Sequence, residues 1–316
     1  MTARVALVGA RGHTGSELVQ LIDKHPYLTL AAAGSRALAG DLVRDHYAID
    51  TALTFEALTP AMLGERDGQF DVVILALPNG QAPAYVEALG THRELPLVID
   101  LSADHRFDEA WFYGLPELTA KHYAGERLIA NPGCYATAMS LVLAPVVQHL
   151  RGGVACFGVS GYSGAGTTPS PRNDPDRLRD NLLPYALTDH LHEREVSRHV
   201  GLPVAFTPHV AAFFRGISMT VTGWLADAHT PADLASHYAD WYAEHPLVTV
   251  AEHIPEPRAL VGRYGAEVGG FGRGGQGPGR ITVVSALDNL LKGAASQAIQ
   301  NINLGLALPP LTGLKP

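Results

Sequence analysis

Hydrophobic residues in the first part of the chain form short continuous runs that alternate with helical patterns. The runs at residues 4–8, 28–33, 70–77 and 95–101 are apolar on both faces. Such runs are typical of parallel strands covered by helices. Apolar spacing predicts one helix from about Glu17 to His25 and another over residues 82–89. This alternation predicts an α/β fold with a Rossmann-like parallel sheet.

The middle of the chain has a different pattern, in which apolar and polar residues alternate. Three such stretches indicate a mixed or antiparallel sheet with one covered face: residues 154–160, 215–224 and 280–285. Residues 288–302 predict a long helix, rich in small residues, that returns to the first domain. The glycine-dense residues 269–279 predict a mobile loop, because no helix follows that could make them a phosphate site.

These patterns divide the chain into two domains. We predict that the Rossmann-like nucleotide-binding domain comprises residues 1–133 and 289–316. Residues 134–288 are expected to form an α+β mixed-sheet domain that holds the substrate and makes subunit contacts.

Composition narrows the class of protein. The 316 residues are 47% hydrophobic, which is ample for a core, and the net charge is −8. An acidic chain without a basic block argues against nucleic acid as the partner. Only two cysteines are present, and no apolar run reaches the roughly 18 residues of a membrane span. We therefore expect a cytoplasmic protein with no membrane partner and no disulfide framework.

A glycine-rich turn links the first strand to the first helix, the arrangement in which a dinucleotide fingerprint gains meaning. Its glycines would let a pyrophosphate approach the helix N-terminus. The residues predicted to bind cofactor here are Gly9, Arg11, Gly12, His13, Thr14 and Gly15. Later loops that begin at the ends of strands, with Leu77 and Pro78 in one and residues 102–104 in the other, would face the same cofactor. Ordinary turn chemistry is the alternative for both loops.

The end of the second strand bears on the choice of cofactor. An NAD site usually has an acid about 20 residues after the turn for the ribose 2′-hydroxyl. Here the strand leads to Ser35 and Arg36 instead. A hydroxyl and a guanidinium suit a 2′-phosphate, so we predict NADP(H). The alternative is that Arg36 is a solvated surface charge.

Cys134 stands after a Pro-Gly break and opens a predicted helix. At a helix N-terminus, unpaired backbone N–H groups and the helix dipole favour the reactive thiolate. The same N–H groups could hold an oxyanion, so Cys134 is a candidate nucleophile. Most free cysteines are instead buried small hydrophobes, as we expect for Cys156.

A nucleophilic cysteine needs a base, and the chain has 15 histidines. His192, with Glu195 three residues later, forms a pair in which the carboxylate could orient the imidazole on a helix. A metal site at residues 190–195 is the rival interpretation. No further Cys/His cluster accompanies it, so we predict no metal.

Two further features could bind an anion. Residues 160–168, including Ser163 and Gly164, follow a strand and offer many backbone N–H groups and hydroxyls. Arg215, at a strand start beside aromatic residues, would suit a substrate carboxylate or phosphate. A flexible turn and a structural salt bridge are the respective alternatives. Together, the residues indicate a Rossmann-type aldehyde dehydrogenase, phosphorylating or simple, without identifying its substrate.

The chain resembles the N-acetyl-gamma-glutamyl-phosphate reductase family. The resemblance is carried, in order, by GARGHTGSEL at residues 9–18, NPGCYATA at 131–138, SGYSGAG at 160–166, FTPHVAAFFRGI at 206–217 and DNLLKGAASQAIQNIN at 288–303. It implies a homodimer or homotetramer that uses NADPH to reduce N-acetylglutamyl phosphate through a Cys134 thioester. Asn289 is then expected at the cofactor, and Asn131, Ser163, Gly164, Glu195, His209 and Arg215 at the substrate.

The family's active histidine lies in an H-R-H-x-P-E-like segment, which His192 and Glu195 match. Leu191 and Arg194 depart from that pattern, so His190 and His209 remain alternatives for the base. Two other acyl phosphates, aspartyl phosphate and a carrier-bound aminoadipyl phosphate, remain alternative substrates. A regulator that binds NADP without catalysis is the alternative from another class.

Overall fold

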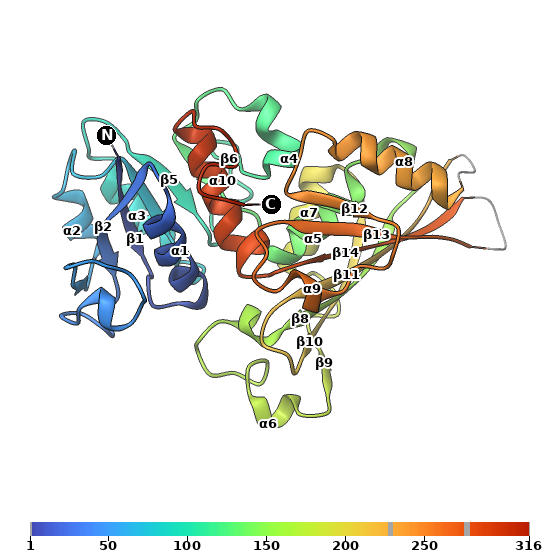
Figure 1. Ribbon diagram of the computed structural model, residues 1–316, viewed down its shortest axis with the longest axis horizontal. Coiled ribbons are helices and arrows are strands. Elements are labelled where there is room, and N and C mark those ends of the chain that lie inside the picture. The colour runs from blue at the N-terminus through green and yellow to red at the C-terminus, as the bar shows by residue number, and fades with distance from the viewer. Residues whose placement is uncertain (1, 227–229, 275–278, 316) are drawn as a thin grey trace. The chain divides into compact units, whose positions relative to one another are not determined.

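The computed structural model describes residues 2–226, 230–274 and 279–315. The chain divides into two compact units, Met1–Pro132 with Ala294–Lys315, and Gly133–Gly293. Each unit is built around one seven-stranded sheet (Figure 1).

The sheet of the first unit has the strand order β3-β2-β1-β4-β5-β7-β6. Every pairing in it is parallel, which confirms the predicted Rossmann-like sheet. Its strands are β1 (Ala3–Val8), β2 (Leu28–Gly34), β3 (Phe55–Glu56), β4 (Val72–Leu75), β5 (Leu97–Asp100), β6 (Phe112–Tyr113) and β7 (Leu128–Ala130). The order of the strands reverses between β1 and β4, and ligands of open α/β sheets bind at such a switch point.

Helices cover this sheet because its strands are apolar on both faces. They are α1 (His13–Lys24), α2 (Pro60–Gly64), α3 (Ala82–Leu89), α4 (Pro116–Thr119) and α10 (Ser296–Gly305). Leu63 of α2 and Leu89 of α3 share a core cluster with Ala6 and Val8 of β1. The final helix begins later than predicted, because residues Leu291–Ala295 form a π-helical turn before α10. Asn301 of α10 donates to the carbonyl of Gly114 at 2.8 Å.

The sheet of the second unit is mixed, as its alternating pattern predicts. Its order is β12-β13-β14-β11-β8-β10-β9, and β11 is antiparallel to β8 and β14 while β8 and β10 are parallel. Its strands are β8 (Val154–Gly161), β9 (Leu182–Pro184), β10 (Val204–Ala211), β11 (Ile217–Trp224), β12 (Val248–Ala251), β13 (Ala266–Arg273) and β14 (Arg280–Leu287). The loop predicted at residues 269–279 is wrong as far as Arg273, because these residues continue β13 and pair with β14. Residues 275–278 lie outside the described residues.

The helices of this unit are α5 (Cys134–Leu143), α6 (Pro175–Leu178), α7 (Leu191–Val200), α8 (Pro231–Tyr242) and α9 (Pro257–Leu260). Helix α7 packs on β10, and α8 packs on β12 and β13. Residues Tyr135–Leu143 of α5 are all buried, and the helix packs on β11 and β14. Gly158 of β8 permits this packing, because a Cβ there would lie 2.7 Å from the Tyr135 ring. In β8, Ala155 and Phe157 alternate with buried residues and face solvent on the open side.

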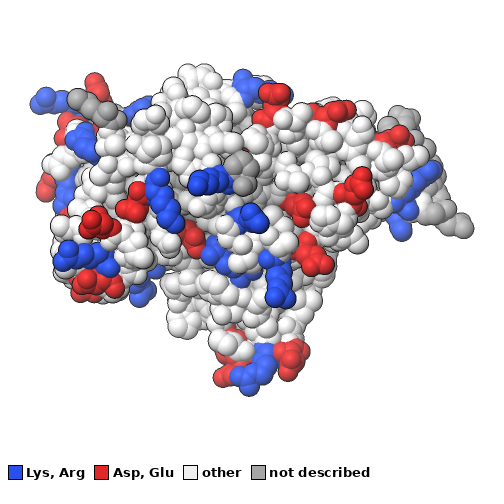
Figure 2. Space-filling model, viewed as in Figure 1, with Lys and Arg blue, Asp and Glu red and all other residues white. Residues whose placement is uncertain are grey.

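Charge is mixed over the visible surface. Figure 2 shows Lys and Arg interspersed with Asp and Glu over most of this face, with several basic side chains near the middle of the view. Within the described ranges, the chain has no helix with the length and apolar character needed to cross a bilayer.

Candidate active site

The glycine-rich turn lies between β1 and α1, as predicted. Gly9 has φ +91°, and a Cβ on it would come within 2.1 Å of the Ala76 carbonyl oxygen at the end of β4. Gly15 is similarly crowded, with its Cβ position 2.2 Å from the Gly9 carbonyl oxygen. The N-cap residue of α1 is Gly12, which has no side chain that could cap the first turn of the helix. These backbone N–H groups therefore suit a pyrophosphate.

Ser35 and Arg36 lie directly after β2 and beside this turn, since the Gly34 carbonyl accepts from the N–H groups of Gly9 and Ala10 at 3.0 and 2.9 Å. Arg36 is exposed. The neighbouring acid, Glu56 of β3, is paired with the guanidinium of Arg66. The end of β2 thus presents a cation where an NAD site presents a carboxylate.

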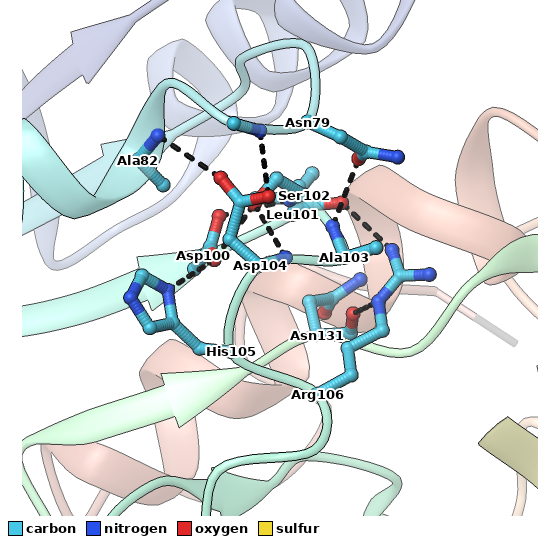
Figure 3. Close-up of polar contacts among 11 residues, drawn as sticks. Asn79, Ala82, Asp100, Leu101, Ser102, Ala103, Asp104, His105, Arg106 and Asn131 are labelled. Atoms are coloured by element: carbon cyan, nitrogen blue, oxygen red, sulfur yellow. Dashed lines mark hydrogen bonds and ion pairs between the residues drawn. The ribbon is translucent and has the colours of Figure 1, made fainter. Parts of the chain in front are cut away.

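The loops that follow β4 and β5 are joined to each other (Figure 3). The Asp104 carboxylate accepts from the N–H groups of Gly80 at 2.6 Å and Ala82 at 3.1 Å. In return, the side-chain carbonyl of Asn79 accepts from the Ala103 N–H at 3.0 Å. These bonds fix the turn that contains Leu77 and Pro78, which the sequence assigns to the cofactor.

The base of the loop after β5 is a buried polar cluster (Figure 3). Asp100, fully buried, accepts from the Ser102 hydroxyl at 2.8 Å and contacts Nδ1 of His105 at 2.6 Å. Arg106, which sequence reasoning missed, donates to the carbonyls of Leu101 at 2.8 Å and Asn131 at 2.9 Å. Residues 102–106 have the composition of an ordinary polar loop, so the sequence does not predict that Arg106 binds these two carbonyls.

Asn131 was expected at the substrate, and the structure gives its side chain an internal partner. Its Oδ1 accepts from Nδ2 of Asn301 on α10 at 3.0 Å, and the residue is 1% exposed. Asn131 therefore ties the end of β7 to α10, and its contact with substrate stays a prediction.

Cys134 is the first residue of α5 and is partly exposed. The N-cap residue of this helix is Gly133, which has no side chain that could cap the first turn. The N–H groups of Tyr135 and Ala136 have no acceptor within the helix, because a helix leaves its first N–H groups unsatisfied. The thiol thus occupies the electrostatic setting that the sequence predicts for a nucleophile.

Glu195 of α7 acts on this helix start. Its carboxylate accepts from the Gly133 N–H at 2.9 Å, and the residue is completely buried. The sequence predicts Glu195 at the substrate and as the group that orients His192; the structure adds that its carboxylate holds the residue before the nucleophile.

Two of the three candidate histidines lie at the start of α7. The Nδ1 atom of His190 accepts from the His192 N–H at 3.1 Å, which makes His190 the N-cap of the helix. Burial, together with the nearby Arg172 cation, lowers the pKa of His190 to about 4. His190 is therefore neutral at physiological pH with Nδ1 committed as an acceptor. The ring of His192 lies 6.1 Å from that of Tyr135, the neighbour of Cys134.

His209 points to the opposite side of the sheet. Its ring packs on Phe157 at 4.5 Å, on the open face, whereas Phe206 packs on Tyr135 of α5 at 4.9 Å. The backbone carbonyl of His209 accepts from the Tyr135 hydroxyl of α5 at 2.6 Å. Residues three apart on a strand point to opposite faces, so the His209 imidazole is not on the side of Cys134.

Arg215, Ser163 and Asn289 belong to one internal network. Arg215 forms an ion pair with Asp288, with Nε 2.7 Å from Oδ2, and its contact with the substrate stays a prediction. The Asn289 side chain accepts from the Gly216 N–H at 2.7 Å and donates to the Ser163 hydroxyl at 2.9 Å. These side chains therefore hold the loop at residues 161–164, of which Gly164 is exposed, against the turn before the final helix.

Gly293 is a second residue that sequence reasoning missed. A Cβ at Gly293 would lie 2.7 Å from Cβ of Cys134, so only glycine lets the chain pass the nucleophile this closely. Its place within the DNLLKGAAS motif is the sequence feature that could have identified Gly293 as a functional position. Among the described residues, no group of three or more His, Cys, Asp or Glu side chains is arranged to hold a metal ion.

Family models match both units of the chain, and named relatives match it over nearly its full length. Residues 4–126 match the family model "Semialdehyde dehydrogenase, NAD binding domain", and residues 134–289 match "Semialdehyde dehydrogenase, dimerisation domain". An N-acetyl-gamma-glutamyl-phosphate reductase from Xanthomonas oryzae pv. oryzae is 51% identical over 99% of this chain and 98% of its own. A protein of the same name from Stenotrophomonas maltophilia is 50% identical over 99% of this chain and 98% of its own.

Solved structures show the same fold at low sequence identity. Aspartate semialdehyde dehydrogenase II from Vibrio cholerae, complexed with ASA, matches with a TM-score of 0.76 at 16% identity, over 97% of this chain and 99% of its own. Aspartate semialdehyde dehydrogenase with NADP from Candida albicans matches with a TM-score of 0.73 at 17% identity, over 96% of this chain and 98% of its own. At this identity the likeness concerns the fold alone.

The two cysteines are expected to differ sharply in reactivity. Iodoacetamide at neutral pH should alkylate Cys134 and leave Cys156 unmodified, because burial raises the pKa of Cys156 to about 12 and the residue is 3% exposed. Peptide mass spectrometry measures the labelled site, and Cys134→Ser should abolish labelling of the folded protein. Equal labelling of both thiols would contradict the assignment.

Proposed function

The chain belongs to the N-acetyl-gamma-glutamyl-phosphate reductase family, and we propose that it reduces N-acetyl-L-glutamyl 5-phosphate to N-acetyl-L-glutamate 5-semialdehyde with NADPH, in arginine biosynthesis. The observation that carries this proposal is Cys134 at the uncapped N-terminus of α5, in a chain whose first unit has the features of a dinucleotide site. Relatives about half identical along almost the full chain support the substrate.

In the first step, the Cys134 thiolate attacks the carbonyl carbon of the acyl phosphate. A C–S bond forms, the C–O bond to phosphate breaks, and inorganic phosphate leaves. The N–H groups of the first turn of α5 stabilise the oxyanion that forms during attack. Because Glu195 already occupies the N–H of Gly133, this stabilisation falls to amides that follow Gly133.

In the second step the thioester is reduced. NADPH supplies the hydride when bound. His192, the histidine at the start of α7 that is not committed as the helix cap, protonates the oxygen of the hemithioacetal and later accepts that proton as the C–S bond breaks. The aldehyde leaves and the Cys134 thiolate is restored. The need for a reduced thiol suits a cytoplasmic location.

The cofactor would be held by the first unit. The N–H groups at the start of α1 suit the pyrophosphate, Ser35 and Arg36 suit the 2′-phosphate of NADP, and the turn with Leu77 and Pro78 borders the same strand ends. Glu56, paired with Arg66, does not offer the ribose acceptor of an NAD site. This arrangement favours NADP over NAD.

The second unit would form a homodimer through the open face of its sheet. That face exposes Phe157 at 43% and Trp224 at 46%, and the family model that covers the unit is a dimerisation domain. Exposed aromatic side chains on a sheet face mark an interaction surface. A homotetramer would need a second surface beyond this one.

The reaction itself provides the main test. NADPH formation from N-acetylglutamate semialdehyde and NADP should require inorganic phosphate, because phosphate releases the acyl group from Cys134. Cys134→Ser should lose activity by about four orders of magnitude or more, as nucleophile variants do. It should still bind NADP, which fluorescence titration measures. Phosphate-independent turnover, or an active Cys134→Ser protein, would contradict the proposal.

Cofactor preference should depend on Arg36. Arg36→Ala should raise the KM for NADP about tenfold or more and leave that for NAD nearly unchanged, because a charge-assisted contact to the 2′-phosphate is lost. Arg44→Ala, at another exposed arginine of this unit, serves as the control. An unchanged ratio of kcat/KM for the two cofactors would show that Arg36 is a solvated surface charge.

The oligomer should depend on Phe157. Phe157→Arg should convert the dimer to monomers at micromolar concentration, because a charge would be buried unpaired in the interface. Light scattering after size-exclusion chromatography measures the mass. Tyr27→Arg, at a residue of the other unit that is 49% exposed, should leave the mass unchanged. A Phe157→Arg protein that keeps its dimer mass would refute this interface.

A further inference from the structure

Arg172 is a cation that has no carboxylate partner within the part of the chain that the structure describes. It lies on the loop between β8 and β9, where the neighbouring acids have other partners: Asp174 accepts from the N–H of Asp176 at 3.0 Å, and Asp176 pairs with Arg179 at 2.6 Å. Over the described residues, no carboxylate lies within ion-pair distance of the Arg172 guanidinium. The loop tip that carries α6 shows charges of both signs in Figure 2.

The backbone that carries Arg172 is held in place by its neighbour. The Asn173 side chain donates to the carbonyls of Gly166 and Thr168, both at 2.8 Å, and accepts from the Ser170 N–H at 2.7 Å. The Arg172 N–H donates to the Ser170 hydroxyl at 3.3 Å. These bonds fix the backbone position of Arg172, although the residue itself is exposed.

The guanidinium is directed toward the cluster beside the nucleophile. Its Cζ atom lies 5.0 Å from the centre of the Tyr185 ring, and that ring lies 5.6 Å from His190. His190 in turn lies 6.3 Å from Tyr135, the residue after Cys134. Burial and the Cys134 charge raise the pKa of Tyr185 to about 12, so the thiol and the guanidinium act electrostatically on the same ring.

The proposed substrate needs such a cation. Acetylation removes the positive charge of the amino group, which leaves the α-carboxylate without compensation inside the molecule. Arg215, the residue expected to meet it, is committed to Asp288. A planar guanidinium can bind a carboxylate through two parallel hydrogen bonds while its face rests on an aromatic ring.

We propose that Arg172 binds the α-carboxylate of the acylated amino-acid substrate, with Tyr185 as the platform that holds its guanidinium plane. Arg172 then selects substrates that carry a carboxylate next to the acylated nitrogen, and it contributes little to the chemistry at Cys134. This inference rests on the proposed function.

The test compares two aldehydes that differ in this one group, N-acetylglutamate semialdehyde and 4-acetamidobutanal, each with NADP and inorganic phosphate. Arg172→Ala should lower kcat/KM for the carboxylated aldehyde about 10- to 100-fold, mainly through KM, and change that for 4-acetamidobutanal less than about twofold. Arg172→Lys should retain part of the preference, because it keeps the charge but loses the bidentate geometry. Arg177→Ala, at an exposed arginine of the same loop, should change neither rate.

The outcomes separate the two proposals. Equal losses on both aldehydes, or none on the carboxylated one, would overturn the role of Arg172 while leaving the reaction established. A wild-type enzyme that does not turn over N-acetylglutamate semialdehyde would overturn the proposed function and this inference with it. If Arg172→Ala does not fold, as judged by circular dichroism, Arg172→Gln is measured in its place.

Discussion

The second unit depends on one buried hydrogen bond, from the Gly133 N–H to the Glu195 carboxylate. A buried carboxylate needs strong partners, since an unpaired buried charge costs several kcal/mol. By satisfying Glu195, the residue before the nucleophile ties the start of α5 to α7, the helix at whose start two of the three candidate histidines lie. The position of Cys134 relative to His192 is therefore set by a contact between residues 62 positions apart, and a shift of either helix would break it.

The same use of buried polar groups recurs at the strand ends of the first unit. Asp104 and Asn79 join two loops that come from different strands, and Asp100 and Arg106 hold the base of one of them. Loops usually carry mobile binding groups, whereas these bonds make this pair rigid. A rigid pair of loops at the switch point of a parallel sheet is suited to a ligand whose position must be reproducible, as a hydride donor requires.

Glycine is required at two positions where segments of the chain approach each other closely. Gly9 is required by both its φ and the Ala76 carbonyl, and Gly293 is required by the proximity of Cys134. In both cases a side chain of any size would displace the element that carries a functional group. The two glycines therefore limit the geometry of the dinucleotide turn and of the nucleophile without touching any reacting atom.

The sequence by itself determined the parallel sheet, the mixed sheet and the helix that begins at Cys134, because hydrophobic periodicity and the glycine and proline positions act locally. It also placed Ser35 and Arg36 at the end of β2. The sequence did not indicate which arginine is paired with an acid. Arg215 is paired with Asp288, 73 residues away, whereas Arg172 has no carboxylate partner among the described residues. The sequence could not exclude His209 either, since that depends on which face of β10 the helices cover. The tertiary structure decided these points, because the pairing and the burial of a side chain are set by residues distant in the chain.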